Sequence, residues 1–348
     1  MNMNMKVKDF QDKLTEWDGF FTLCGVEKVF KEKYMEYVSN LISKGVPPIF
    51  DFQHLCGLLG VRDNFLAAAV HAPESFYRTF EIPKRSGGKR EITAPYSSLK
   101  YVQTWIYKNI LLRAKVHGCA HGFVSKRSIL TNAKIHSHQK CLLKMDLKDF
   151  FPSIPKEWVI QLFNSLGYEG QISYFLASLC CFENALPQGS PASPAISNIV
   201  AMHLDRRLYR LAKHFDLHYS RYADDIAFSG ESIPSLFITY ASDIITDCGF
   251  KVNDSKIRLY GEHGNKIITG ISLATGVPRI PRDYRRRLEK ELHYIDKYGL
   301  KGHVAHNKIR DPRYLESLIG RVGFWLMVEP DNAYARQMQA KLKLEMGA

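Results

Sequence analysis

The chain has 348 residues, of which 45% are hydrophobic and 12% aromatic, so it can bury a substantial core and is not an intrinsically disordered protein. Its 48 Lys and Arg residues outnumber its 35 Asp and Glu residues, and this surplus of +13 favours a polyanionic partner such as nucleic acid. The first 75 residues carry 8 basic and 10 acidic side chains, so the surplus lies in the remainder. We therefore expect the anionic partner to bind the later part of the chain. Basic charge alone is also compatible with an ordinary soluble protein.

Cysteine usage and hydropathy bear on the compartment. The seven cysteines are an odd number and form no Cys-x-x-Cys pair, a pattern typical of a reducing compartment and not of a disulfide scaffold or a zinc ribbon. The longest apolar stretch, around residues 174–182, is far shorter than the roughly 18 residues that a membrane span requires. We expect a soluble cytoplasmic protein with no membrane partner.

The amino-terminal part is predicted to be helical. Large apolar residues recur every three or four positions between residues 26 and 42, which predicts an amphipathic helix that ends at residues 45–48, Gly-Val-Pro-Pro. Asp51 and Asp63 each precede a short apolar run, and each is expected to cap a helix. We assign residues 1–75 to a small helical module.

A basic β-hairpin is predicted across residues 80–95, where two extended runs meet at Gly87-Gly88. Lys89 and Arg90 follow these glycines without the spacing and the hydroxyl of a P-loop, so that type of nucleotide site is excluded. Helical spacing resumes between residues 99 and 110, and again from Asp283 towards the C-terminus.

Three aspartates are the candidates for a catalytic metal site. Asp224 and Asp225 lie between two β-prone runs, so a tight hairpin would hold both at its tip, where like charges repel unless a cation neutralises them. Asp146 ends a mostly apolar segment that is predicted to be a central strand, and a buried carboxylate needs a partner. If the hairpin packs beside this strand, the three carboxylates could hold two Mg²⁺ ions for an in-line displacement at phosphorus. Taken alone, an Asp-Asp pair such as Asp224-Asp225 is more often a solvated turn than a metal site.

Four motifs resemble those of reverse transcriptases and occur in that family's order, over residues 52–330. They are Asp146 with Phe150-Phe151, Leu186-Pro187-Gln188-Gly189 with Ser193-Pro194, Tyr222-Ala223-Asp224-Asp225, and Gly249-Phe250-Lys251-Val252-Asn253 with Lys256. The chain looks most like a bacterial retron reverse transcriptase. Asn132-Ala133-Lys134-Ile135-His136 matches the retron Asn-Ala-x-x-His pattern, and Ile268-Thr269-Gly270 stands where retrons usually have Val-Thr-Gly.

The resemblance implies an α+β right-hand polymerase fold. The fingers and a palm with an antiparallel sheet would be interwoven over residues 76–273, and a helical thumb over residues 274–348 would bind RNA or a duplex. The helical module 1–75 would precede them.

The resemblance also implies roles for single residues. Asp146, Asp224 and Asp225 would bind two Mg²⁺ ions and be catalytic. The deoxynucleoside triphosphate (dNTP) would be bound by Lys84, Arg90, Phe151, Gln188 and Lys256. Phe151 would exclude a ribose 2′-hydroxyl, and Lys256 is a possible general acid near the leaving pyrophosphate. A core aromatic and a solvated lysine are the alternatives for these two residues.

A further set of residues would contact RNA: Asn132, His136, Thr269, Gly270, Arg285, Arg286 and Arg287. Arginines at the start of a thumb helix would bind phosphates without reading sequence. For His136, an ordinary histidine satisfied within a helix is nearly as good an interpretation, and a zinc site with His138 is disfavoured because no cysteine or acidic ligand lies close in the sequence.

In function, the resemblance implies an RNA-directed DNA polymerase in the bacterial cytoplasm. Its template would be a cognate structured non-coding RNA, and a guanosine 2′-hydroxyl would prime synthesis of branched multicopy single-stranded DNA. Such systems act with an effector protein in defence against phage. The alternatives are a group II intron-like, diversity-generating or abortive-infection reverse transcriptase, or an RNA-binding scaffold without turnover.

Overall fold

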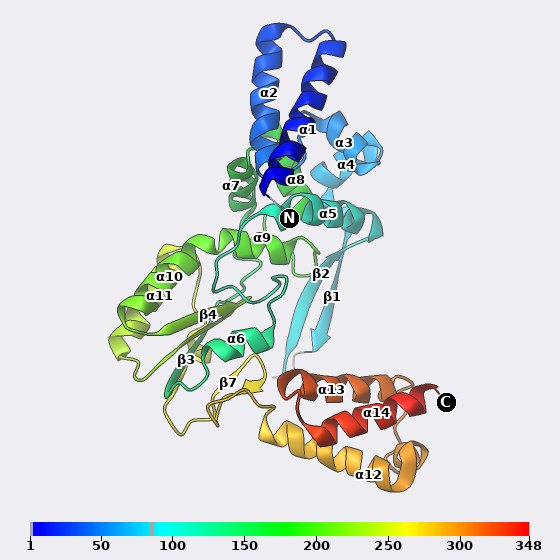
Figure 1. The fold of residues 1–348 in the computed structure, drawn as a ribbon, viewed down its shortest axis with the longest axis vertical. Coiled ribbons are helices and arrows are strands. Elements are labelled where there is room, and N and C mark those ends of the chain that lie inside the picture. Colours follow the sequence, from blue (N-terminus) through cyan, green and yellow to red (C-terminus); the bar gives the residue numbers. More distant parts are fainter. Residues whose placement is uncertain (1–2, 84–86, 348) are drawn as a thin grey trace. The chain divides into compact units, whose positions relative to one another are not determined.

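The computed structural model describes residues 3–83 and 87–347, which form a mixed α+β protein with antiparallel sheets (Figure 1). The chain divides into two compact units, and each is made of segments distant in the sequence. The first unit comprises Met1–Gly118, Lys148–Arg206 and Thr246–Lys251, and the second comprises Cys119–Leu147, Arg207–Ile245 and Val252–Ala348. The three consecutive domains expected from the resemblance stay a prediction. None of the described helices combines the length and the apolar character needed to cross a bilayer.

The first unit is mainly helical, and Figure 1 shows its helices α1 and α2 running side by side. Its elements, with η denoting a 3₁₀ helix, are α1 (Met3–Leu23), α2 (Lys28–Ser43), α3 (Phe52–Leu59), α4 (Asp63–His71), η1 (Pro73–Phe76), β1 (Tyr77–Pro83), β2 (Lys89–Pro95), α5 (Ser97–Asn109), η2 (Leu111–Arg113), α7 (Lys156–Leu166), α8 (Gly170–Cys180) and α9 (Ser193–Val200).

The amino-terminal predictions can be compared with these helices. The helix expected over residues 26–42 is α2. Asp51 caps α3 as predicted, because its carboxylate accepts a hydrogen bond from the backbone N–H of His54 at 2.7 Å. The cap predicted at Asp63 is wrong: Arg62 is the N-cap and Asp63 is the first residue of α4. An acidic residue in the first turn still favours the helix dipole there.

The predicted hairpin is confirmed. Strands β1 and β2 pair antiparallel from Tyr77 opposite Pro95 to Pro83 opposite Lys89. Gly87 and Gly88 both have positive φ, 87° and 78°, a conformation that favours glycine in the connection. Lys84, one of the expected dNTP contacts, lies outside the described residues.

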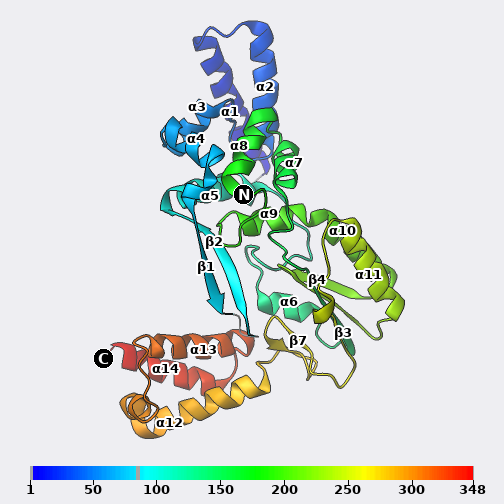
Figure 2. The same cartoon turned by 180° about the vertical axis from the view of Figure 1, so that it is seen from behind.

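The second unit contains the main sheet, seen from behind in Figure 2. The elements of this part of the chain are α6 (Ile129–Ile135), β3 (Cys141–Asp146), α10 (Met202–His214), β4 (His218–Tyr222), β5 (Asp225–Gly230), α11 (Ser235–Asp247), η3 (Asp254–Lys256), β6 (Arg258–Tyr260), β7 (Ile267–Ile268), β8 (Ile271–Ser272), α12 (Arg282–His306), α13 (Tyr314–Val328) and α14 (Ala333–Gly347). Helices α10 and α11 each run across the boundary between the two units.

The main sheet has the strand order β4-β5-β3-β6, and its neighbouring strands are antiparallel. On one face, Phe237 of α11 packs edge-on against Phe228 of β5, with ring centroids 4.8 Å apart. On the other face, α6 lies against β4. Strand β3 is paired on both sides, so the carboxylate at its end is held by the most restrained strand of the sheet.

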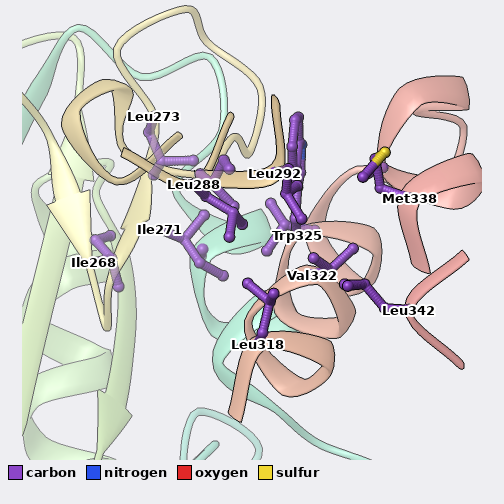
Figure 3. Packing of buried hydrophobic residues seen from close by; sticks show 14 of the residues in the cluster. Ile268, Ile271, Leu273, Leu288, Leu292, Leu318, Val322, Trp325, Met338 and Leu342 are labelled. Atoms are coloured by element: carbon purple, nitrogen blue, oxygen red, sulfur yellow. The ribbon is translucent and has the colours of Figure 1, made fainter. Parts of the chain in front are cut away.

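A hydrophobic cluster joins the C-terminal helices to β7 and β8 (Figure 3). Helix α12 contributes Leu288 and Leu292, whereas α13 contributes Leu318 and Trp325, all buried. The remaining labelled members are Ile268, Ile271, Leu273, Val322, Met338 and Leu342. Burial of this apolar surface is the main force that holds the three helices together.

Replacement of Leu318 by Ala should destabilise the second unit by ~2–5 kcal/mol, because the Leu318 side chain is fully buried and its removal leaves a cavity. Leu344→Ala is the matched control, since Leu344 is 76% exposed on α14. The free energy of unfolding in urea, followed by tryptophan fluorescence, measures the difference. Equal stability of the two variants would contradict the assignment of Leu318 to the core.

Candidate active site

Two of the three candidate aspartates lie on neighbouring strands. Asp146, the last residue of β3, pairs with Asp225, the first residue of β5. Paired residues on antiparallel strands have Cα atoms about 5 Å apart, so the two carboxyl groups emerge at the same end of the sheet. This register arises because the buried residues Leu143 and Met145 of β3 are held opposite Phe228 and Ile226 of β5.

The third aspartate lies in the turn between β4 and β5. Tyr222 pairs with Asp225, so Ala223 and Asp224 form a two-residue connection, the tight hairpin expected from the sequence. Ala223 has a φ of 56°, which is unfavourable for a residue with a side chain. The backbone N–H of Leu147, just after β3, donates to the carbonyl oxygen of Asp224 at 3.0 Å. This bond fixes the turn against the end of the central strand.

The turn is also supported from the loop 119–122, which the sequence analysis did not single out. A Cβ atom added to Gly122 would lie 2.7 Å from the backbone nitrogen of Ala223, so only glycine allows this approach. The buried Arg221 donates from Nη1 to the carbonyl oxygen of Ala223 at 3.0 Å. Its own backbone is bonded to Cys119 and His121. These contacts join residues about a hundred positions apart, so they cannot be predicted from any local pattern in the sequence.

The carboxylates are electrostatically strained. Burial is the largest cause that raises the pKa of Asp224, and the neighbouring charges of Asp225 and Asp146 raise it further. Burial also raises the pKa of Asp225, with a contribution from Asp146, while Lys144 and Lys256 act in the opposite direction. The cluster therefore favours positive charge at this end of the sheet.

Lys256 supplies part of that charge. Its Nζ atom donates to both carboxylate oxygens of Asp146, at 2.8 and 2.9 Å, and its hydrogen bond to Asp146 is the largest cause that raises the pKa of Lys256. The short helix η3 carries this lysine, and Asn253 before it donates its backbone N–H to the carbonyl oxygen of Asp146 at 2.8 Å. Sequence reasoning placed Lys256 near the pyrophosphate and did not foresee this pairing.

Oxygen donors from three carboxylates match the chemistry that Mg²⁺ prefers. In the described part of the chain, however, no group of three or more His, Cys, Asp or Glu side chains is gathered as a metal site. The ammonium group of Lys256 instead lies where it neutralises Asp146. The donor set and the strand register fit a divalent cation, provided that Asp146 exchanges Lys256 for it.

Three expected dNTP contacts belong to the first unit. Phe151 is partly buried and packs against the buried Phe150, with ring centroids 5.6 Å apart. Arg90 is exposed on β2, opposite Ile82. Gln188 is partly buried, and its carbonyl oxygen accepts a hydrogen bond from the backbone N–H of Thr93 at 3.1 Å.

The loop that carries Gln188 is held by a buried polar network. Ser190 donates to the side-chain oxygen of Gln103 at 2.8 Å, and the amide nitrogen of Gln103 donates to the hydroxyl of Tyr77 and the carbonyl of Leu179. Gly189 has a φ of 148°, and a Cβ atom there would lie 2.7 Å from the carbonyl oxygen of Thr93. Helix α5, which contains Gln103, thus positions this loop against β2.

Asn132 and His136 lie inside the second unit. Their exposed fractions are 1% and 2%, so neither side chain is available to an RNA in this conformation, in contrast to the expected direct contact. The two ring nitrogens of His136 bond to Ser229 of β5 and Ser220 of β4, each at 2.7 Å. Burial is the main cause that lowers the pKa of His136, to about 3, so the ring is neutral and links the two strands of the β4–β5 hairpin.

The remaining residues expected to contact RNA differ in whether their side chains are exposed or engaged within the protein. Thr269 and Gly270 form the turn between β7 and β8, both with positive φ, 46° and 84°. Arg285 is engaged within the protein, since it pairs with Glu289 at 2.9 Å and its guanidinium lies over the ring of Trp325. Arg286 and Arg287 are exposed.

Comparison with known proteins identifies the family. The family model "Reverse transcriptase (RNA-dependent DNA polymerase)" matches residues 82–273, more than half of the chain. The chain belongs to the reverse transcriptase family.

Its relatives give the group within that family. The chain is 35% identical to the retron Mx162 reverse transcriptase of Myxococcus xanthus over 73% of its length, and this match spans only 58% of the relative. It is 33% identical to the retron Mx65 reverse transcriptase of the same organism, over 81% of this chain and 74% of the relative. Within the family it is a retron reverse transcriptase. A solved foamy viral protease-reverse transcriptase in complex with double-stranded DNA is 15% identical, with a TM-score of 0.40 over 91% of this chain and 52% of that one.

Gly122→Ala should slow DNA synthesis by about tenfold to a hundredfold, because the added methyl group displaces the turn that carries Asp224. Gly118→Ala is the matched control, since nothing lies within 4 Å of a Cβ atom at that position. Single-nucleotide incorporation by the two purified variants measures the difference. If both retain the wild-type rate, the close approach of Gly122 does not constrain the site.

The free energy of unfolding should fall as the pH is lowered from about 6.5 towards 3, because His136 takes up a proton in the unfolded chain but not in the folded one. The stabilisation is complete above the unfolded pKa and is lost below it. His136→Gln should show a shallower fall over this range, although it is less stable at neutral pH. The control is His263→Gln, at an exposed position. His121 and His218 are unchanged in both variants, so a difference in slope belongs to His136.

Proposed function

We propose that this chain copies a structured non-coding RNA into DNA, beginning from a guanosine 2′-hydroxyl of that RNA. The product is then a branched RNA–DNA molecule, multicopy single-stranded DNA. The observation that supports polymerisation is the pairing of Asp146 with Asp225 beside the turn that holds Asp224. The retron group supports the structured template and the branched product, and the role in phage defence with an effector protein is part of the same proposal.

The three carboxylates would hold two Mg²⁺ ions. Bound there, Mg²⁺ supplies charge neutralisation to the triphosphate and acidifies the priming hydroxyl. The chain's contribution is to keep three negative charges on two neighbouring strands and the adjoining turn, so that the cation site needs little reorganisation. Lys256 neutralises Asp146 in this structure, and with cations held by the aspartates its ammonium group would be available to donate a proton to the leaving pyrophosphate.

The first-unit residues would bind the incoming nucleotide. Arg90, on the β1–β2 hairpin, has the guanidinium geometry that suits phosphate oxygens, and the ammonium group of Lys84 would add positive charge for the same phosphates. Phe151 would exclude a ribonucleotide by its bulk, and Gln188 would line the base and sugar pocket. In this proposal residues 76–273 act as the fingers and palm and residues 274–348 as the thumb of a right-hand polymerase.

The RNA surface is proposed for the second unit. Arg286 and Arg287 are exposed on α12 and can contact phosphates, and the Thr269-Gly270 turn presents its backbone to a partner. Asn132 and His136 would act on the template only through the hairpin that they support.

Asp224→Asn combined with Asp225→Asn should abolish DNA synthesis and leave RNA binding largely intact, because it removes the ligand charge without adding bulk. The wild type and the variant are each expressed with the flanking non-coding RNA, and the nucleic acid that copurifies is sequenced. The wild type should carry DNA joined to the RNA through a 2′–5′ bond, and the double variant should carry the RNA alone.

The control is Asp243→Asn combined with Asp331→Asn, two exposed acids outside the site. This control should keep the wild-type yield of DNA. An undiminished yield of DNA from the Asp224→Asn, Asp225→Asn variant would show that these carboxylates are not needed for DNA synthesis. A DNA that starts from an ordinary 3′-hydroxyl would contradict the proposed 2′-hydroxyl priming and branched product, but not the proposed RNA-directed DNA synthesis.

A further inference from the structure

Helix α12 is bent at Gly299, whose φ of 74° and ψ of 161° are not helical. The bend lies in the middle of the C-terminal helical part and borders a pocket of about 970 Å³. The pocket is lined from both sides of the bend, by Arg287, Lys290, Tyr294 and Tyr298 before it and by His306 and Asn307 after it. Neither the active site nor the hydrophobic cluster uses these two tyrosines.

The two tyrosines form an exposed aromatic surface. Tyr294 is 41% exposed and Tyr298 59%, and their rings are almost parallel, at 18° with centroids 6.3 Å apart. They are four residues apart and therefore lie on one face of the helix. Lys297 lies over the ring of Tyr298 at 5.1 Å. Exposed parallel rings beside cations are typical of surfaces on which unpaired bases stack.

The charge around the pocket is positive. The three acids of α12 that follow Arg287 are each paired within the protein: Glu289 with Arg285, Glu291 with Arg321, and Asp296 with Lys341. In the described part of the chain neither Arg287 nor Lys290 forms an ion pair, and both are exposed. Two cations thus remain at the rim for a polyanion.

The floor of the pocket is preformed. Glu291 accepts hydrogen bonds from both terminal nitrogens of Arg321, at 2.6 and 2.9 Å, and from the hydroxyl of Tyr314. Burial raises the pKa of Glu291, but the hydrogen bonds from Arg321 and Tyr314, together with the charges of Arg321 and His303, lower it overall. The buried His303 stacks on Tyr314 at 6.0 Å and 17°. Glu291 and His303 line the pocket together with the two exposed tyrosines, and a lining that is already fixed reduces the ordering cost of binding.

We infer that this pocket binds an unpaired, single-stranded stretch of nucleic acid, whose bases stack on Tyr294 and Tyr298 while its phosphates contact Arg287 and Lys290. The inference rests on the proposed RNA-directed synthesis and adds a requirement to it: the bound nucleic acid is unpaired at this point. Inside a duplex the base faces are stacked on one another and only the two ends expose one, so a duplex gains mainly the phosphate contacts.

The test measures the binding of three fluorescent probes to the full chain: an oligo(U) RNA of about 12 nucleotides, the oligo(dT) of the same length, and a blunt RNA duplex of that length. Tyr294→Leu combined with Tyr298→Leu should weaken binding of the single strands about tenfold or more, because stacking on each ring is lost. The affinity for the duplex should change less than about twofold. Tyr294→Phe combined with Tyr298→Phe should retain the wild-type affinity, since the rings remain.

The matched control is Tyr101→Leu combined with Tyr240→Leu, which removes two exposed rings elsewhere. A larger loss with the RNA probe assigns the pocket to the template, and an equal loss with DNA assigns it to either strand. An equal loss for duplex and single strands, or unchanged binding by the Leu variant, overturns the inference. Thermal unfolding of the Phe and Leu variants shows whether either variant has a folding defect. If the Leu variant is misfolded, the Phe variant is photocrosslinked to single-stranded 5-iodouridine RNA: crosslinks on α12 support the inference, and their absence from α12 overturns it.

The binding measurement requires no nucleotide incorporation. A wild-type chain that binds the single strands through these tyrosines but synthesises no DNA would overturn the proposed function alone. A wild-type chain that synthesises DNA while the Leu variant binds normally would overturn this inference alone.

Discussion

The repulsion between like charges on neighbouring strands is the constraint around which the main sheet is organised. Asp146 and Asp225 are paired across β3 and β5, and Asp224 adjoins them. Left unopposed, this repulsion and the burial of the charges would separate the ends of the strands. The central position of β3, the bond from Leu147 to Asp224 and the ion pair with Lys256 all oppose it. Such an arrangement costs folding free energy, and it is useful where a cation binds.

His136 serves the same constraint from the middle of the hairpin. Its ring bonds one serine on β4 and one on β5, so a slip of one strand by one residue would break a bond and turn the serine to the opposite face. Burial keeps the ring neutral, so one ring nitrogen carries the proton and donates to its serine while the other nitrogen accepts. By fixing the register of β4 and β5, the buried His136 ring helps to keep Asp225 beside Asp146. Asp225 lies four residues before Ser229 on β5. The burial of Asn132 and His136 is consistent with action through the sheet.

The sequence was sufficient where the determinants are local. The central strand β3, the tight turn at Ala223-Asp224 and the Asp51 cap each depend on a few adjacent residues, and each is present in the structure. It was insufficient where a contact joins distant segments, as between Gly122 and Ala223 or between Lys256 and Asp146. The burial of Asn132 was hidden for the same reason, since a polar residue in a helix carries no local sign of which face the sheet will cover.

The C-terminal helices show why a count of basic residues does not locate a binding surface. Arg285, Arg286 and Arg287 are equivalent in sequence, yet Arg285 is engaged by Glu289 and Trp325 while its two neighbours are exposed. A cation that is already paired must exchange its partner to bind a phosphate, and that exchange yields little free energy. The binding surface is therefore defined by the cations that the fold leaves unpaired and by the apolar groups beside them. On α12 the pocket residues lie on both sides of the bend at Gly299, which separates them into two helical segments that line the same pocket.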